Sequence, residues 1–180
     1  GWLFTAEEAR AIPDEVALQA AVDRISDVRA KLARLGTDLV LVPLPAKIDI
    51  AAAFAPDPAM AAAMGALHVQ FVARTRQSGI TIIDPRPALL AQGPQSFLAT
   101  DTHWTPLGAR VTAQTVAKDL PQGPLIFATG PPSRKILTGD LIRYVTTDDL
   151  APRIGLRSET VIIAPLTATG LAVDIFATAP

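Results

Sequence analysis

Apolar residues recur at helical spacing near the start of the chain, and charged residues fill most positions between them. The apolar stripe consists of Ala21, Ile25, Val28, Leu32 and Leu35. Asp14 can cap the start of this segment, and Gly36 follows its end. The pattern predicts an amphipathic helix over residues 14–35 with one buried face.

Two nearly continuous apolar runs, at residues 38–43 and 80–85, flank a second helical pattern. Runs of this kind are typical of central strands in a parallel sheet that is covered on both faces. Between them, Asp57 and Pro58 provide a helix start, and Gly79 follows the helix end. The buried stripe of this helix consists of Met60, Met64, Leu67 and Phe71. Strand, helix and strand with short connections predict a βαβ unit with a right-handed crossover.

The second half of the chain has weaker periodicity. A third helix is predicted from Pro106 to about Leu120. Beyond Gly123 the alternation is poor, and the strand candidates are residues 125–127, 141–145, 160–163 and 173–176. No internal repeat is visible, so we expect one α/β domain.

Composition narrows the functional classes. Hydrophobic residues make up 49% of the 180 residues and charged residues 18%, which predicts a folded domain with a substantial core. The net charge is −1 and no basic run exceeds Ser133-Arg134-Lys135, so no nucleic-acid partner is expected. The chain has no cysteine, which excludes disulfides, zinc–thiolate sites and a cysteine nucleophile. The sequence contains no run of about 18 apolar residues, so it predicts no transmembrane segment.

Reactive groups concentrate in one segment, residues 101–106. In an extended chain Asp101 and His103 point to the same side, because they are two residues apart. A carboxylate next to an imidazole fixes its tautomer and stabilises the imidazolium that forms when the ring takes a proton. One interpretation of this pair is therefore an imidazole base that a carboxylate orients, with Trp104 as a wall of the site. The alternative is local hydrogen bonding beside a helix cap, with Trp104 packed underneath.

Other candidates are weaker. Lys47 ends the first strand region, at the edge where open α/β sheets bind ligands, so it either contacts an anionic substrate or is solvated. Arg143 and Tyr144 can line the same cleft. His68 reads as a boundary residue on its helix, since no second ligand lies one helical turn away. We expect neither a metal nor a cofactor, because the chain has two histidines and no glycine-rich phosphate loop.

The segment Asp101-Thr102-His103-Trp104-Thr105-Pro106-Leu107-Gly108-Ala109 resembles the D-x-H-W-T-x-x-G-A signature of the alginate O-acetyltransferase family. Three further segments resemble elements of that family in the same order. They are Gly1-Trp2-Leu3-Phe4, Leu41-Val42-Pro43-Leu44-Pro45-Ala46-Lys47 and Thr138-Gly139-Asp140-Leu141. The resemblance covers the chain from Gly1 to about Val145.

The resemblance implies a three-layer αβα SGNH-hydrolase-like domain with a mostly parallel sheet. It implies an O-acetyltransferase or acetylesterase that acts on exopolysaccharide hydroxyls through a Ser-His-Asp triad. Asp101 and His103 would be catalytic, and Trp104 and Lys47 would bind the polysaccharide. The protein would lie in the periplasm or cell envelope and receive acetyl groups through a membrane-bound acyltransferase partner.

The serines of the chain depart from the family pattern, in which the nucleophile follows a later core strand in a G-x-S context. They are Ser26, Ser78, Ser96, Ser133 and Ser158, and none has that context. We therefore expect residues 1–180 to form a single domain that is incomplete at its C-terminus and lacks the nucleophile segment. One alternative is a non-catalytic carbohydrate-binding or assembly module of the same fold. Another is an unrelated α/β domain with a chance Asp-x-His.

Overall fold

A computed structural model describes residues 1–9, 14–121, 123 and 126–169. Its α-helices are α1 (Ala6–Ala9), α2 (Glu15–Ala33), α3 (Lys47–Ile50), α4 (Pro58–Gln77), α5 (Arg86–Gln92) and α6 (Pro106–Asp119). Its 3-10 turns are η1 (Ala52–Phe54), η2 (Pro94–Ser96), η3 (Ile142–Tyr144) and η4 (Ala151–Ile154). Its strands are β1 (Val40–Leu41), β2 (Thr81–Ile82), β3 (Phe127–Thr129), β4 (Ser133–Leu137), β5 (Glu159–Ile163) and β6 (Leu166–Ala168).

The first predicted helix is confirmed as α2, but its predicted buried face is wrong: Leu18 and Val22 are the buried residues, whereas Val28 and Leu35 are exposed. The Asp14 side chain accepts hydrogen bonds from the N–H groups of Val16 and Ala17, which satisfies two free donors at the helix start. Gly36 adopts φ 72° just beyond the helix, a conformation that glycine reaches without steric cost.

The βαβ prediction is also confirmed. β1 and β2 pair in parallel, with Val40 opposite Thr81, and α4 connects them. Asp57 caps α4 through the Ala59 N–H. The two strands are shorter than the apolar runs that predicted them.

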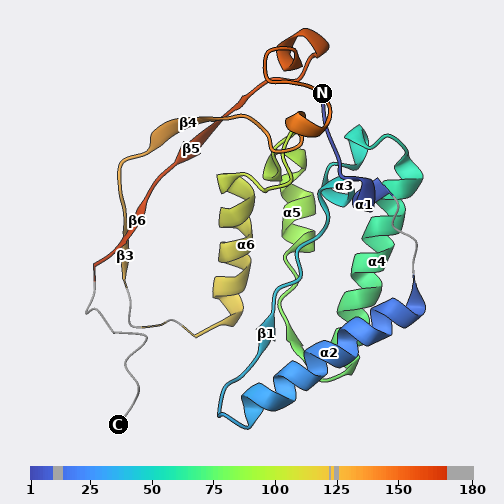
Figure 1. Cartoon of the computed structure of the whole chain (residues 1–180). Helices are drawn as coiled ribbons and strands as arrows, with labels where there is room; N and C mark the ends of the chain where they lie inside the picture. The colour runs from blue at the N-terminus through green and yellow to red at the C-terminus, as the bar shows by residue number, and fades with distance from the viewer. Residues whose placement is uncertain (10–13, 122, 124–125, 170–180) are drawn as a thin grey trace.

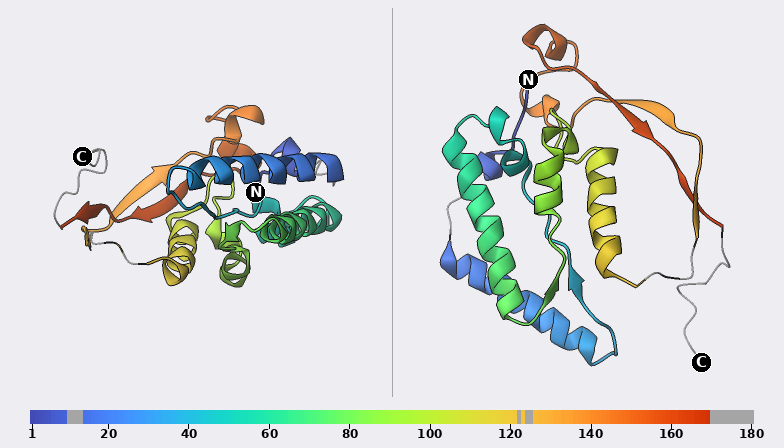
Figure 2. Two further views of the ribbon diagram at one scale, coloured as in Figure 1. Left: turned by 90° about the horizontal axis from the view of Figure 1, so that it is seen from below. Right: turned by 180° about the vertical axis from the view of Figure 1, so that it is seen from behind.

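The β1–β2 pair lies between two layers of helices. Figure 2 shows α2 on one side of the pair, with α4, α5 and α6 on the other. In the part of the chain that the structure describes, no helix is long and apolar enough to cross a bilayer.

The expected mostly parallel sheet is not confirmed. Among the described residues only β1 and β2 pair in parallel, whereas β4–β5 and β3–β6 are antiparallel pairs. These two pairs form a long ribbon that extends past α6 (Figure 1). The connection between β4 and β5 contains only the turns η3 and η4, and without a crossover helix the second strand returns antiparallel.

The strand predictions beyond Gly123 have mixed outcomes. The strand expected at 160–163 is confirmed as β5, and the one expected at 125–127 overlaps β3 at its last residue. The strand expected at 141–145 is wrong, because this apolar run forms η3. The strand expected at 173–176 lies outside the described residues.

A small apolar cluster underlies the Asp-x-His segment. Ile50, Leu89 and Phe97 are buried together, and Trp2, Trp104 and Val111 pack against them. Phe97 and Trp104 form an antiparallel bridge. The cluster therefore fixes both ends of the loop that carries Asp101 and His103.

Two glycines allow neighbouring chain segments to approach this loop closely. A Cβ added at Gly108 would lie 2.2 Å from the Ser96 carbonyl oxygen. A Cβ added at Gly139 would lie 2.1 Å from the Thr100 carbonyl oxygen. Both neighbours are backbone atoms, so neither contact is relieved by rotating a side chain.

We predict that Gly139→Ala destabilises the fold, because the added methyl group must push the 138–140 segment away from Thr100. The expected loss in the free energy of unfolding is about 1–3 kcal/mol, measured by urea denaturation. Gly123→Ala is the matched control, since nothing lies within 4 Å of the Cβ position there. Equal stabilities for the two variants would contradict the close approach.

Candidate active site

A tight loop presents Asp101 and His103 at its tip. The His103 carbonyl accepts from the Leu98 N–H at 3.1 Å, and the Ser96 carbonyl accepts from the Thr105 N–H at 2.9 Å. α6 begins directly after this loop, because Thr105 caps it through the Gly108 N–H and Pro106 occupies its first turn. The start of α6 and the hydrogen bonds at the ends of the loop therefore fix the short segment that carries the two side chains.

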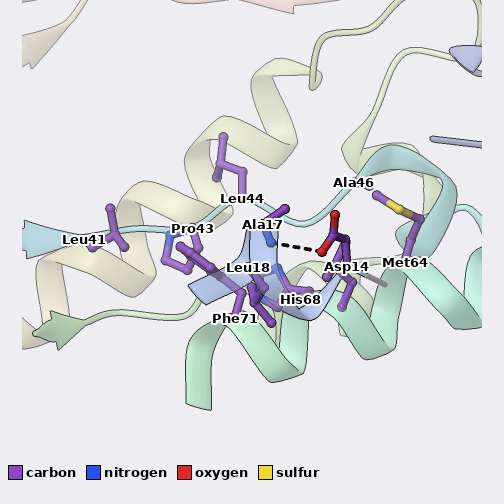
Figure 3. Close-up of a pocket in the computed structure, with 11 residues that line it drawn as sticks. Asp14, Ala17, Leu18, Leu41, Pro43, Leu44, Ala46, Met64, His68 and Phe71 are labelled. Carbon is purple, nitrogen blue, oxygen red and sulfur yellow. Dashed lines mark hydrogen bonds between the residues drawn. The ribbon is translucent and has the colours of Figure 1, made fainter. Parts of the chain in front are cut away.

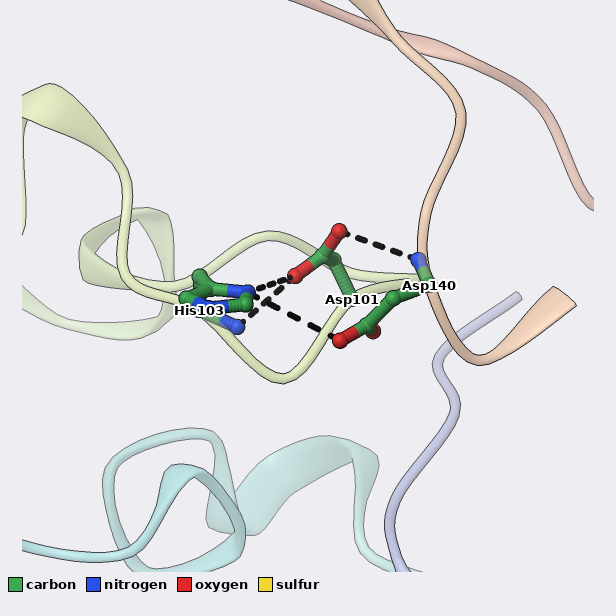
Figure 4. Close-up of side chains that lie close together, drawn as sticks. All are labelled: Asp101, His103 and Asp140. Carbon is green, nitrogen blue, oxygen red and sulfur yellow. Dashed lines mark hydrogen bonds and ion pairs between the residues drawn. The ribbon is translucent and has the colours of Figure 1, made fainter.

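The carboxylate of Asp101 is hydrogen-bonded on both oxygens (Figure 4). Its Oδ1 accepts from His103 Nδ1 at 2.6 Å and from the His103 backbone N–H at 2.9 Å. Its Oδ2 accepts from the Asp140 backbone N–H at 3.0 Å. Asp101 is therefore held in one orientation toward the imidazole.

His103 is accessible on its other side. Its side chain is 73% exposed, whereas the side chain of Asp101 is 12% exposed. When Nδ1 donates to a carboxylate, the lone pair of the neutral ring lies on Nε2. The structure thus brings the two predicted residues together with Nε2 available to take a proton, and their catalytic role stays a prediction.

Asp140 is a third acidic group at this site, to which sequence reasoning assigned no role. Its Oδ2 lies 3.7 Å from His103 Nδ1. Its oxygens accept from the backbone N–H of Thr102 at 2.8 Å and from the Thr102 hydroxyl at 2.6 Å. The signal for it was its position after a glycine in the segment Thr138-Gly139-Asp140-Leu141.

The hydrogen bonds of the pair shift the pKa values of both groups. Partial burial alone would raise the pKa of Asp101, but hydrogen bonds from the His103 backbone, the His103 ring and the Asp140 backbone outweigh it and lower that pKa. The hydrogen bond to Asp101 raises the pKa of His103 above 6.5; burial opposes this rise, and the negative charges of Asp101 and Asp140 add to it. Asp101 is thus ionised and the imidazolium is stabilised.

The same three residues are the only described group with ligand atoms close enough to share a metal ion, within 4.8 Å of one another. A cation there would have to displace the Nδ1–H donor from Asp101, and Asp140 already accepts two hydrogen bonds from Thr102. The arrangement therefore fits a proton-transfer pair better than a metal centre.

Lys47 lies below this loop instead of at the surface. Its Nζ donates to the carbonyl oxygens of Leu3 at 2.6 Å, Ala99 at 2.9 Å and Asp101 at 2.9 Å, and the residue is 3% exposed. Both alternatives raised for Lys47, a substrate contact and a solvated ammonium, require exposure. The structure corrects both, because tertiary contacts bury the ammonium.

The charge of Lys47 is kept at neutral pH. Burial lowers the pKa of Lys47 to about 8, while four nearby carboxylates oppose that shift. They belong to Glu8, Glu159, Asp101 and Asp140. The ammonium therefore has three donors for three carbonyl acceptors below that pKa.

A hollow of about 400 Å³ lies next to His103. Its lining includes Trp104, Ala109 and, from the β4–β5 ribbon, Leu137 and Val161. Trp104 packs on the apolar cluster and also lines the hollow, which leaves its side chain half-buried. Among the described residues, no serine lines this hollow.

Arg143 and Tyr144 line a different hollow, which Thr102 and Asp140 also line. The two side chains contact each other, with the guanidinium carbon 5.1 Å from the Tyr144 ring centre. They do not line the hollow at His103, so the expectation that they share a cleft with it is not supported.

An apolar hollow of about 620 Å³ lies away from this site, between α2, α4 and β1 (Figure 3). His68 lines it and bonds through Nε2 to Asp84 at 2.9 Å. His68 is buried, which corrects its interpretation as a boundary residue. The hollow has few polar groups that converge on a ligand, so the smaller one at His103 is the better candidate for chemistry.

Comparison with known proteins gives one consistent result. Residues 1–173 match the family described as SGNH hydrolase-like domain, acetyltransferase AlgX. The probable alginate O-acetylase AlgJ of Pseudomonas aeruginosa is 32% identical over 171 residues, which are 88% of this chain and 43% of that protein. The protein of the same name from Pseudomonas putida is 33% identical over 159 residues, covering 83% and 41%. The chain spans less than half the length of these relatives.

Solved structures are also similar to this chain. The O-acetyltransferase domain of Pseudomonas putida AlgJ superposes with a TM-score of 0.79 at 29% identity, covering 93% of this chain and 63% of that one. Pseudomonas aeruginosa AlgX superposes with a TM-score of 0.61 at 23% identity, covering 97% and 41%, which supports the fold alone.

We predict that substitutions at the two carboxylates lower the pKa of His103 to different extents. Asp101→Asn replaces the charged acceptor of the hydrogen bond that contributes most to the raised pKa with a neutral amide, so the value should fall toward 6.5. Asp140 acts on His103 through its charge and makes no hydrogen bond to the ring, so Asp140→Asn should give an intermediate value. NMR titration of the His103 imidazole protons measures both pKa values. The same pKa in all three proteins would contradict the observed geometry.

Proposed function

The chain belongs to the family of SGNH hydrolase-like AlgX acetyltransferase domains, and on that premise we propose that it is the O-acetyltransferase domain of an alginate-acetylating protein. The sequence-based expectation of an SGNH-hydrolase-like fold is confirmed by the family match and the structural similarity. The observation that carries the functional proposal is the hydrogen bond between Asp101 and His103 within the matching D-x-H-W segment.

In the proposed reaction, His103 is the general base and Asp101 orients it. A serine oxygen attacks the carbonyl carbon of the donor's acetyl group while His103 Nε2 takes the serine proton. The imidazolium then gives this proton to the leaving group, which departs as the acetyl-serine forms. A sugar hydroxyl attacks that ester, gives its proton to His103 and leaves as the acetylated sugar, and the imidazolium returns the proton to the serine oxygen.

The nucleophilic serine is not among the described residues that line the hollow at His103. Ser96 is the described serine closest in sequence to the pair, but it is fully buried. We place the nucleophile in a different segment of the protein, as in the family pattern. The same observation favours the alternative, a non-catalytic carbohydrate-binding or assembly module.

The substrate would be a polysaccharide whose sugar rings lie against Trp104 in the hollow beside His103. Aromatic side chains provide apolar faces of the size of a sugar ring. The acetyl donor would reach the site through a membrane-bound acyltransferase, and the site would lie in the periplasm. The names of the relatives, which specify alginate, support this substrate class.

We predict that His103→Gln in the full-length protein abolishes acetyl-ester turnover without loss of stability. The side chain is 73% exposed, so its replacement removes little packing. Asp101→Asn should reduce turnover on the order of 10⁴-fold, the effect known for a triad carboxylate. Acetyl release from an activated ester measures turnover, and thermal denaturation measures stability.

Lys118→Gln is the control, because this exposed lysine lies in the last turn of α6. If the wild type turns over the ester and His103→Gln retains that turnover, the proposed mechanism is excluded. An inactive full-length wild type would favour the non-catalytic module.

A further inference from the structure

Segment 99–101 leads into the loop that presents Asp101 and His103. Charged side chains form hydrogen bonds with both the carbonyl and the amide groups of this segment. Lys47 donates to the carbonyl oxygens of Ala99 and Asp101, each at 2.9 Å. The carboxylate of Glu159 accepts from the N–H groups of Ala99 at 2.9 Å and Thr100 at 3.0 Å. A cation and an anion thus bind the same three residues.

Lys47 joins this segment to residues 2–4, which form the N-terminal arm. It also donates to the Leu3 carbonyl at 2.6 Å, and its ammonium lies 5.4 Å from the Trp2 ring centre and 5.3 Å from that of Phe4. Such distances allow favourable cation–π contacts. The arm and segment 99–101 are therefore attached to one buried charge.

Glu159 joins the segment to the ribbon. It is the first residue of β5 and pairs with Leu137 at the end of β4. The chain continues from Leu137 to Asp140, whose N–H donates to Asp101 Oδ2, and to Leu141, whose N–H donates to the Thr100 carbonyl at 3.2 Å. The ribbon thereby holds both the main chain and the carboxylate of Asp101.

We infer that Lys47 and Glu159 are a matched pair of positioning residues, which clamp segment 99–101 so that the Asp101 carboxylate meets His103 Nδ1. This inference rests on the proposed function for its catalytic meaning. Neither residue contacts His103 by a hydrogen bond in the described structure, and neither lines the hollow beside it. An aspartate side chain has only two rotatable bonds, so fixing its main chain largely fixes its oxygens.

The test uses Lys47→Met in the full-length protein, which keeps the length of the side chain and removes its donors. The pKa of His103 is measured from the pH dependence of its modification by diethyl pyrocarbonate, read by peptide mass spectrometry. Loss of positioning weakens the bond to Asp101, so this pKa should fall. Removal of a nearby positive charge alone would raise it. A raised or unchanged pKa in a folded variant would overturn the inference.

Turnover gives a second readout. A displacement of about 1 Å in a catalytic group can cost on the order of 100-fold in rate. Lys47→Met should therefore lower kcat by about 10- to 100-fold and leave KM nearly unchanged. Lys118→Met is the matched control and should change neither kcat nor the pKa. The pKa readout needs no turnover, so an inactive wild type would count against the proposed function and leave the positioning test intact.

Glu159→Asp keeps the inference testable if Lys47→Met does not fold. This variant preserves the charge and withdraws the carboxylate by one methylene group, so the hydrogen bonds to residues 99 and 100 are lost. The pKa of His103 should fall, although no charge has been removed. Glu15→Asp is the control, since Glu15 of α2 pairs with Arg74 of α4, and α4 lies across the molecule from the ribbon in Figure 1. An unchanged His103 pKa in Glu159→Asp would refute the clamp.

Discussion

The hydrogen bond between His103 Nδ1 and Asp101 Oδ1, at 2.6 Å, is the interaction on which the rest of the site depends. It fixes the ring tautomer, raises the pKa of the imidazole and leaves Nε2 toward solvent. The bond is local, because the two residues are separated by one position. The orientation of the Asp101 carboxylate, however, depends on a distant part of the chain, because the carboxylate also accepts a hydrogen bond from the Asp140 backbone N–H.

The scaffold supports this bond from three directions. The start of α6 and the apolar cluster beneath Trp104 hold the C-terminal side of the loop. Lys47 anchors the preceding residues from the N-terminal half of the fold, and Glu159 anchors them from the ribbon. Gly139 allows the ribbon connection to lie against the Thr100 carbonyl. Elements from the whole described chain thus converge on one short segment.

Local patterns in the sequence predicted the features that depend on neighbouring residues. The caps Asp14 and Asp57, the βαβ unit and the Asp-x-His pair each depend on contacts within a few positions or on a continuous apolar run. The burial of Lys47 depends on carbonyl groups 44 to 54 positions away, and local spacing carries no information about them. The roles of Asp140 and Glu159 were missed for the same reason. The apolar run at 141–145 forms a turn instead of a strand. Its Leu141 N–H donates to the Thr100 carbonyl, and the N–H groups of Ile142, Tyr144 and Val145 donate to carbonyls three residues earlier.

Covalent trapping of the nucleophile tests whether His103 activates a serine. The full-length protein is treated with a fluorophosphonate, which reacts with activated serines, and the labelled peptide is identified by mass spectrometry. We expect one labelled serine other than Ser26, Ser78, Ser96, Ser133 and Ser158, and loss of labelling in His103→Gln. Labelling that persists without the imidazole would contradict the assignment of His103 as the base.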